Sequence, residues 1–453
     1  FNAVELMPIM EFNGNNSWGY NTNFYMAPDK AYGSPRDYKD FIEACHREGM
    51  AVILDIVFNQ SDGLHPWYQM YPVDSNPFYN KTAPHAYSVL NDWNQGHPLV
   101  QQQWTDALRY WMEKYNVDGF RFDLVKGLGD NDSYTSVSGT DLYNQSRVDR
   151  MARLHSVIKS VKPDGIHINE NLAGNKEETA MGNDGQINWA NINNASCQYA
   201  MGYDTENDLN RFLSTKDGNR PWGTTISYAE SHDEQRVAYK VDAYAPDAVK
   251  DNKDNKYARL GALATQMLLT PGPKMVWQFG ELGNNQNTKN SDGGNNTDPK
   301  IVDWAGWLGD ADRAALMNTY SRLINLRRNN PELFTRQATF VTTDLSGGYN
   351  AYRYMRLLNG SKEVIAFINP SLTSSMTVSC PASVISYSNH ELYASSKGVA
   401  DNLNGSGTVS VTLPANGFAV YVSKDISSTD EISAAPAARV YGENGRIVID
   451  GDY

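Results

Sequence analysis

The pentapeptide Gly119-Phe120-Arg121-Phe122-Asp123 decides how the rest of the chain is interpreted. Successive side chains of a strand point to opposite faces, so Arg121 and Asp123 share one face and the two phenylalanines share the other. A face that carries Arg and Asp is costly to bury unless both charges have partners. An aspartate at the carboxyl end of a short apolar strand is typical of the catalytic groups of α/β-barrel enzymes. A turn-capping aspartate with a local salt bridge is the alternative, and this stretch alone does not exclude it.

An alternation of apolar strands and amphipathic helices extends from this stretch in both directions. The clearest helix has Ser34 as a good N-cap and Pro35 at its first helical position, and it ends near Gly49. Seven short runs are predicted to be strands: residues 4–9, 51–57, 119–123, 166–170, 198–201, 225–231 and 274–278. Alternation at this spacing predicts a parallel sheet. We expect an α/β fold, a (β/α)8 TIM barrel, whose first strand lies upstream of Phe1.

The pattern of the sequence changes after a predicted helix at about residues 310–329. Residues 338–424 alternate apolar and polar side chains between turns rich in Ser, Asn and Gly, which predicts a small antiparallel β domain. The expected organisation is a barrel domain at 1–335 with an inserted loop or subdomain at about 60–97, a β domain at 336–424, a linker at 425–437 and the start of a truncated β segment at 438–453.

The charge and composition of the chain limit the kinds of molecule that it is expected to bind. The 453 residues include 39 Lys and Arg against 52 Asp and Glu, a formal net charge of -13. This acidic balance argues against nucleic acids and anionic membranes as partners and favours a neutral substrate. No apolar run approaches the length of a membrane span. Three widely spaced cysteines give neither a disulfide framework nor a zinc spacing.

Four predicted strand ends carry polar groups that are hard to explain as structure alone. Residues 55–59, Arg121 with Asp123, Glu170, and His232 with Asp233 would all lie at the carboxyl face of the barrel. Because parallel strands present their carboxyl ends at one edge, this set favours an acid/base carboxylate enzyme over a structural network.

Carboxylates without a nucleophilic Ser or Cys motif indicate glycoside hydrolysis, in which one carboxylate attacks the sugar and another protonates the leaving oxygen. Arg121 beside Asp123 would keep that carboxylate charged, and Glu170 is the better shielded candidate for the proton donor. A divalent-metal hydrolase is the rival interpretation, but it needs several His ligands, and only His167 and His232 lie near strand ends.

At this point the sequence resembles the α-amylase family of glycoside hydrolases (family 13), from Phe1 to about Lys424. The resemblance rests on four motifs in the family's order and on a stacking-aromatic motif. These are Asp55-Ile56-Val57-Phe58-Asn59, residues 119–126, Asn169-Glu170-Asn171, Ser231-His232-Asp233, and Trp18-Gly19-Tyr20. The resemblance implies a barrel with an insertion after its third strand and a C-terminal antiparallel β-sandwich.

The same resemblance implies roles for individual residues. Asp123 would be the nucleophile, Glu170 the general acid/base and Asp233 the transition-state stabiliser of a retaining reaction on α-glucans of the starch and glycogen type. The residues expected to contact or hold the substrate are Tyr20, Arg121, His232, Lys126 and Gln60. A retaining mechanism requires the two reacting carboxyl groups to lie about 5–5.5 Å apart.

Two positions depart from the family pattern. Gln60 stands where the family has a His that binds the sugar, and Gly127 stands where many members have a His after Lys126. Gln60 can donate and accept hydrogen bonds but cannot carry charge, so we expect altered affinity or specificity. The resemblance also makes Asn59 a candidate ligand of a structural calcium ion, while no cofactor is required for the chemistry.

The sequence leaves the activity within the family open. Residues 5–9 and 17–21 resemble branching enzymes and pullulanase-type debranching enzymes as much as α-amylases, and residues 199–204 resemble branching enzymes. A glucan branching transferase or debranching enzyme, and a non-catalytic α-glucan-binding protein, therefore stand beside the hydrolase. Residues 438–452 resemble the start of sorting tails on secreted proteins of Bacteroidetes-type bacteria, which implies a secreted, cell-surface or periplasmic protein.

Overall fold

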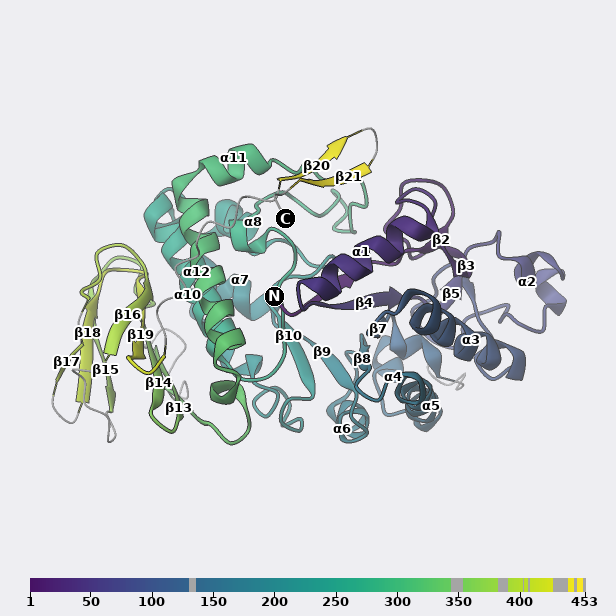
Figure 1. Cartoon of the computed structure of the whole chain (residues 1–453), viewed down its shortest axis with the longest axis horizontal. Coiled ribbons are helices and arrows are strands. Elements are labelled where there is room, and N and C mark those ends of the chain that lie inside the picture. The colour runs from purple at the N-terminus through teal and green to yellow at the C-terminus, as the bar shows by residue number, and fades with distance from the viewer. Residues whose placement is uncertain are drawn as a thin grey trace. The chain divides into compact units, whose positions relative to one another are not determined.

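The computed structural model describes residues 1–129, 136–343, 353–381, 390–401, 403–405, 408–426, 439–443 and 446–450 (Figure 1). The chain divides into two compact units, and each is described by itself. Unit 1 comprises residues 1–189, 297–299 and 432–453, and unit 2 comprises residues 190–296 and 300–431.

A parallel sheet forms the centre of unit 1. Its strands follow one another in chain order: β1 (Ala3–Leu6), β4 (Ala51–Ile56), β7 (Gly119–Phe122), β8 (Ile166–Asn169) and the first residues of β9 (Ile187–Asn191). Every registered neighbour pair in this series is parallel. Two small antiparallel pairs join β2 (Met10–Phe12) to β3 (Thr22–Pro28) and β5 (Gln60–Ser61) to β6 (Asn91–Asp92). The predicted strands at 51–57, 119–123 and 166–170 are confirmed.

Helices cover this sheet and bury their apolar stripes against it. The longest are α1 (Pro35–Arg47), α3 (Pro98–Tyr115) and α5 (Gln145–Val161); shorter ones are α2 (Pro66–Gln69), α4 (Val137–Thr140), α6 (Asn175–Asn183), η1 (Val73–Ser75) and η2 (Val125–Leu128). Ser34 caps α1 as predicted, because its side chain accepts the N–H of Asp37. Cys45 is buried in one apolar core with Tyr38 of α1 and Trp111 of α3.

The predicted strand at 198–201 is wrong. These residues end the helix α7 (Asn193–Met201), and the strand of this repeat is β9. A four-residue apolar run fits a buried helix as well as a strand, and the neighbouring Ala195, Ser196 and Cys197 are buried on the same helix. The true strand was missed because two of its five residues, Asn188 and Asn191, are polar and lower its apolar character.

Unit 2 begins with the end of β9 and continues with the parallel strands β10 (Thr225–Tyr228) and β11 (Lys274–Met275). Its helices are α7, α8 (Val237–Tyr244), α9 (Asp247–Lys250), α10 (Lys253–Leu269), α11 (Trp304–Gly309), α12 (Ala311–Asn329), η3 (Leu209–Phe212), η4 (Gly280–Leu282) and η5 (Pro331–Phe334). Helices α10 and α12 pack on each other in parallel, because Lys253 at the start of α10 pairs with Asp310 at the start of α12 and Leu268 near the end of α10 accepts a bond from Arg327 near the end of α12. A single apolar core joins both helices to β13 (Arg353–Asn359) and β14 (Lys362–Ile368).

Two antiparallel sheets form the rest of unit 2, as the alternating pattern predicts. One has the order β12 (Thr339–Thr342), β13 (Arg353–Asn359), β14 (Lys362–Ile368), β19 (Phe418–Ser423), β16 (His390–Ser395); the other has β15 (Met376–Pro381), β18 (Thr408–Leu413), β17 (Asn404–Gly405). Along β14, Val364 and Ala366 join the helical core, whereas Ile365 and Phe367 join a second core between the two sheets. Because successive side chains point to opposite faces, β14 contributes to the helical core on one face and to the core between the sheets on the other.

The described chain ends in a β-hairpin of β20 (Arg439–Glu443) and β21 (Arg446–Asp450). The predicted linker at 425–437 lies outside the described residues from 427 onward. Within the described ranges, no helix has both the length and the apolar character that crossing a membrane requires.

Candidate active site

Parallel strands of unit 1 bring three predicted carboxylates to one edge. Asp55 of β4 is paired in register with Arg121 of β7. Asp123 follows β7 directly, and its N–H donates to Ile56 at 3.0 Å; Glu170 follows β8, and its N–H donates to Phe122 at 3.0 Å. The ladder therefore continues through both residues, so the strands themselves fix the direction of their side chains.

The Arg121 guanidinium lies at the centre of these carboxylates and is fully buried. Its Nη1 donates to both Asp55 carboxylate oxygens at 2.9 Å and to Asp123 Oδ1 at 3.0 Å, and its Nη2 lies 3.3 Å from Glu170 Oε2. The same group stacks on the Trp189 ring, 4.2 Å from the ring centroid. One cation thus orients three carboxylates that come from three strands.

Burial and neighbouring charges oppose each other in this cluster. Burial lowers the pKa of Arg121, but the charges of Asp55 and Glu170 outweigh it and raise that pKa above its ordinary value. Burial raises the pKa of Glu5 to about 7, although the charge of Arg121 opposes the rise. Burial also raises the pKa of Asp55. The single positive charge of Arg121 cannot neutralise all of the neighbouring carboxylates. One carboxyl group of the cluster is therefore favoured to keep its proton near neutral pH.

Glu170 is held by the backbone of the neighbouring strand end. Its Oε2 accepts the N–H of Leu124 at 2.8 Å, and Leu124 has a left-handed backbone with φ of 43°. Such a backbone is strained for a branched side chain and persists only where its surroundings fix it. The side chains of Asp123 and Glu170 keep 13% and 16% of their surface exposed, so both carboxylates reach solvent while the arginine between them does not.

Tyr20 and Gln60 lie beside this cluster. The Tyr20 hydroxyl donates to Asp55 Oδ2 at 2.7 Å. The Gln60 amide donates to the Tyr20 carbonyl at 3.1 Å and accepts from Asn59 Nδ2 at 2.8 Å, and only 2% of the residue is exposed. Both ends of the Gln60 amide therefore have protein partners, and the residue joins the Tyr20 loop to the end of β4.

The structure explains the glycine that follows Lys126. A Cβ at Gly127 would lie 1.8 Å from Asn59 Oδ1, so no side chain fits there without displacing Asn59. Lys126 itself forms an ion pair with Asp141 at 2.6 Å and lies over the ring of Tyr87. The predicted substrate contact of Lys126 would thus have to compete with an existing carboxylate partner.

Asn59 does not by itself make a calcium site. Its Oδ1 is buried without a hydrogen-bond partner, which leaves one oxygen available to a cation. Calcium takes six to eight oxygen ligands, several of them carboxylates. In the part of the chain that the structure describes, no three His, Cys, Asp or Glu residues are placed to hold a metal ion. The Asn59 oxygen alone identifies no calcium site, and calcium binding stays a prediction from the sequence.

His232 and Asp233 follow β10 and lie in unit 2. His232 Nε2 is 3.2 Å from Asp233 Oδ2, and Asn295 Nδ2 donates to Asp233 Oδ1 at 2.9 Å. The Asp233 side chain is 41% exposed, whereas His232 is buried. Asn295 belongs to a loop that the sequence analysis did not connect with this motif, because more than sixty residues separate the two.

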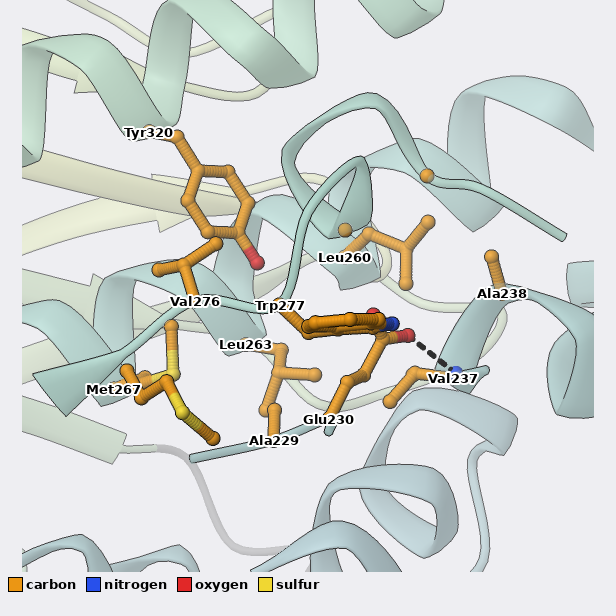
Figure 2. A pocket seen from close by; sticks show the side chains of 13 residues that line it. Ala229, Glu230, Val237, Ala238, Leu260, Leu263, Met267, Val276, Trp277 and Tyr320 are labelled. Atoms are coloured by element: carbon orange, nitrogen blue, oxygen red, sulfur yellow. Dashed lines mark hydrogen bonds between the residues drawn. The ribbon is translucent and has the colours of Figure 1, made fainter. Parts of the chain in front are cut away.

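Glu230 is a second residue that the sequence analysis missed. Its carboxylate accepts the N–H of Val237 at 2.6 Å and pairs with Arg236 Nη1 at 3.0 Å, which closes the segment that carries His232 and Asp233. Figure 2 shows this hydrogen bond in a small pocket that Trp277 also lines, with a cavity of about 20 Å³, the size of one water molecule. A Glu followed six residues later by an Arg has no local periodicity, so only the fold reveals the pair.

Comparison with known proteins identifies related sequences. A family model described as "Alpha amylase, catalytic domain" matches residues 1–317. The chain is similar to a 1,4-alpha-glucan branching enzyme of Lactobacillus acidophilus, with 27% identity over 361 residues covering 74% of this chain and 52% of the relative. It is also similar to an isoamylase of a Flavobacterium species, with 24% identity over 423 residues covering 76% and 53%. The chain spans about half the length of these curated relatives.

Solved structures share the fold at low sequence identity. An alpha-amylase of Geobacillus thermoleovorans, complexed with acarbose, superposes with a TM-score of 0.70 at 18% identity and covers 93% of this chain and 88% of its own. A pullulanase of an Anoxybacillus species, complexed with maltotetraose, gives 0.69 at 17% identity and covers 93% and 63%. These likenesses confirm the predicted fold class, a TIM-type barrel followed by antiparallel β-sheets.

Proposed function

The chain belongs to the alpha-amylase family, and from this premise we propose that it is a retaining glycoside hydrolase of starch- and glycogen-type α-glucans. The observation that carries the proposal is the Arg121 guanidinium, which pairs with both Asp123 and Glu170 at the ends of neighbouring parallel strands. Two carboxylates held together by one cation, each partly exposed, suit a nucleophile and an acid that act on one bond.

In the first half of the reaction, an Asp123 oxygen attacks the anomeric carbon. The bond from that carbon to the glucosidic oxygen breaks, and its electron pair goes to the oxygen, which takes a proton from Glu170. In the second half, the Glu170 carboxylate removes a proton from water, whose oxygen attacks the anomeric carbon. The glucosyl ester breaks and Asp123 regains its charge, so two inversions give net retention.

The other predicted residues would bind and orient the sugar. Tyr20 presents an aromatic ring for stacking, and its hydroxyl is already directed by Asp55. His232 and Asp233 would bind ring hydroxyls and stabilise the sugar cation. Gln60, whose amide is occupied by protein partners, would support Tyr20 rather than contact the sugar.

The test is release of reducing ends from soluble starch by the full chain and by Asp123→Asn. We expect release from the parent and a loss of at least about a thousandfold in the variant, because the amide cannot form the ester. Asp106→Asn, at an exposed carboxylate of α3, is the matched control and should retain full activity. Binding of starch without turnover, unchanged by Asp123→Asn, would refute the hydrolase and favour the non-catalytic binding protein.

A glucan branching transferase is the second candidate, and the similarity to 1,4-alpha-glucan branching enzymes favours it. In that case a sugar hydroxyl replaces water in the second half of the reaction, with the same two carboxylates. Chain-length analysis of amylose after incubation and enzymatic debranching separates the two activities. New branch chains with few new reducing ends would indicate the transferase, and the reverse would indicate the hydrolase.

A further inference from the structure

The loop that follows η4 is bound to the segment that carries the fourth motif. Residues 287–295, here called the 287–295 loop, lie in unit 2 and fold back through a bridge between Lys289 and Asn295. Backbone bonds from Asn290 to Gly294 at 2.8 Å and from Gly293 to Asn290 at 3.0 Å close its tip. The loop is therefore a small hairpin of its own, with two ends that can contact a neighbour.

One end of the hairpin contacts Asp233 from two sides. Asn295 Nδ2 donates to the Asp233 carboxylate at 2.9 Å. Lys289 Nζ donates to the main-chain carbonyl of Asp233 and also to Asn295 Oδ1. Lys289 therefore fixes the orientation of the Asn295 amide, so that its NH₂ group, and not its oxygen, faces the carboxylate.

The two residues before Lys289, at the base of the same hairpin, bind the two residues after Asp233. Thr288 Oγ1 lies 3.0 Å from the Glu234 carbonyl oxygen and 2.9 Å from Gln235 Oε1, and its one proton bonds to either of them. The Thr288 N–H donates to the same Gln235 oxygen at 3.0 Å. Gln235 Nε2 returns a bond to Asn287 Oδ1 at 2.6 Å. Asp233 and the two residues that follow it are thus all hydrogen-bonded to one hairpin.

We propose that the 287–295 loop sets the orientation of the Asp233 carboxylate, with Asn295 as a positioning residue. This inference rests on the proposed function, in which Asp233 stabilises the sugar cation. A donor that cannot rotate holds one carboxylate oxygen of Asp233 and leaves the other beside His232. An exposed carboxylate has many rotamers, and the hairpin removes that freedom before substrate binds.

Within the described part of unit 2, the charged and titratable groups that contact Asp233 or adjoin it in the chain are His232, Lys289 and Glu234. The decisive variant is Asn295→Asp, which keeps the shape and replaces the donor with a second carboxylate. Two carboxylates at this distance retain a proton, so the acid limb of the kcat/KM profile should move up by about one pH unit or more. We expect kcat to fall at least about tenfold with a smaller change in KM.

Ser291→Asp is the matched control, since it adds the same charge at the exposed tip of the same hairpin. The inference is supported if only Asn295→Asp shifts the acid limb. It is overturned if the two variants share one profile, because a general charge effect or loosening of the hairpin would then explain both.

A second measurement tests the contact without using activity. At pH 8 the urea midpoint of Asn295→Asp should fall below that of Ser291→Asp, and adding Asp233→Asn should restore it, because donor and acceptor are then exchanged. Additive losses in the double variant would overturn the inference. A parent protein that is inactive on every α-glucan would refute the proposed function, while this midpoint cycle would still decide whether Asn295 controls Asp233.

Discussion

At the scale of single residues, one guanidinium forms ion pairs with several carboxylates. Arg121 is fully buried and pairs with Asp55, Asp123 and Glu170. A planar, permanently charged fork can bridge separate strands, whereas the compact ammonium of lysine cannot. The nucleophile and the acid of the proposed reaction therefore depend on one side chain that never needs to touch the substrate.

Replacing Arg121 with Lys should impair both activity and stability. The ammonium reaches at most part of the cluster and leaves at least one buried carboxylate unpaired, so we expect a loss of about 3 kcal/mol in the free energy of unfolding. The displaced carboxylates should lower kcat by about a hundredfold. Urea unfolding and reducing-end assays measure the two effects. Arg109→Lys, in an exposed pair with Glu113 on α3, should change neither, and equal effects at the two sites would contradict this prediction.

Glu5 makes the stability of the chain depend on pH near neutrality. Burial raises its folded-state pKa from 4.5 to about 7, so the folded state holds a proton that the unfolded state has lost. Stability from this group is complete below the unfolded pKa and is lost as the pH rises through about 7. Glu5→Gln has no such proton and should flatten the fall in unfolding free energy between pH 6 and pH 8.

The measurement for Glu5 is urea unfolding at pH 6, 7 and 8. Glu43→Gln, at an exposed carboxylate of α1, serves as the control and should follow the parent profile. Parallel profiles for the parent and Glu5→Gln would show that another group causes the pH dependence.

At the scale of elements, the candidate catalytic residues lie at the ends of strands, and contacts from other segments fix the loop that follows β10. β4, β7 and β8 deliver Asp55, Asp123 and Glu170 through their hydrogen-bond ladders. The end of β10 is instead followed by a loop, which needs two outside supports: the Glu230 carboxylate across its base and the 287–295 loop along its side. Asp123 and Glu170 are thus positioned by the hydrogen bonds of their strands, whereas Asp233 is positioned by a loop that other segments hold.

Glu230→Gln tests the support at the base of this loop. The amide can still accept the N–H of Val237, but it leaves the buried Arg236 without an ion-pair partner. We expect a loss of about 3 kcal/mol in unfolding free energy, and a fall in kcat of about tenfold because Asp233 is then less well positioned. Thermal melting and steady-state kinetics check both. Glu206→Gln, at an exposed site of unit 2, should match the parent; an unchanged Glu230 variant would mean that the ion pair does not hold the loop.

At the scale of the whole molecule, unit 2 combines helices of the barrel with the antiparallel sheets in one fold. The buried Arg259 of α10 donates to the carbonyls of Ala200 and Tyr199 at the end of α7, to the carbonyl of Pro370 and to Asn416 Oδ1. A shared apolar core spans the same elements. The helices and the sheets of unit 2 should therefore unfold together.

Arg259→Met removes the donor from four buried acceptors while keeping much of the side-chain volume. Each unpaired acceptor costs about 1–3 kcal/mol, so we expect a loss of at least about 3 kcal/mol in unfolding free energy and one shifted transition. Urea denaturation followed by tryptophan fluorescence and by circular dichroism measures this. Arg336→Met, at an exposed position, should have little effect. Two separate transitions in the Arg259 variant would show that the helices and the sheets are independent.

Much of the architecture could be predicted from the sequence because it depends on patterns among residues that are close together in the chain. The cap at Ser34 and the alternation along β14 each depend on a few neighbouring residues, and both were confirmed. The strand at 187–191 was missed because its polar residues hide it, and four apolar residues of α7 were mistaken for it. Glu230 and Asn295 could not be predicted, since their partners are chosen by the fold and not by spacing.

The sequence by itself determined the parallel β/α order, the antiparallel C-terminal region and the strand ends at which Asp123, Glu170 and Asp233 lie. These follow from periodicity and from motifs whose order is preserved along the chain. Only the tertiary structure decided that Arg121 joins Asp55, Asp123 and Glu170, that the Gln60 amide is used by the protein, and that a distant hairpin holds Asp233. The physical reason is that hydrogen bonds and ion pairs depend on distances of a few ångströms, and strand register and loop closure set those distances across long separations in sequence.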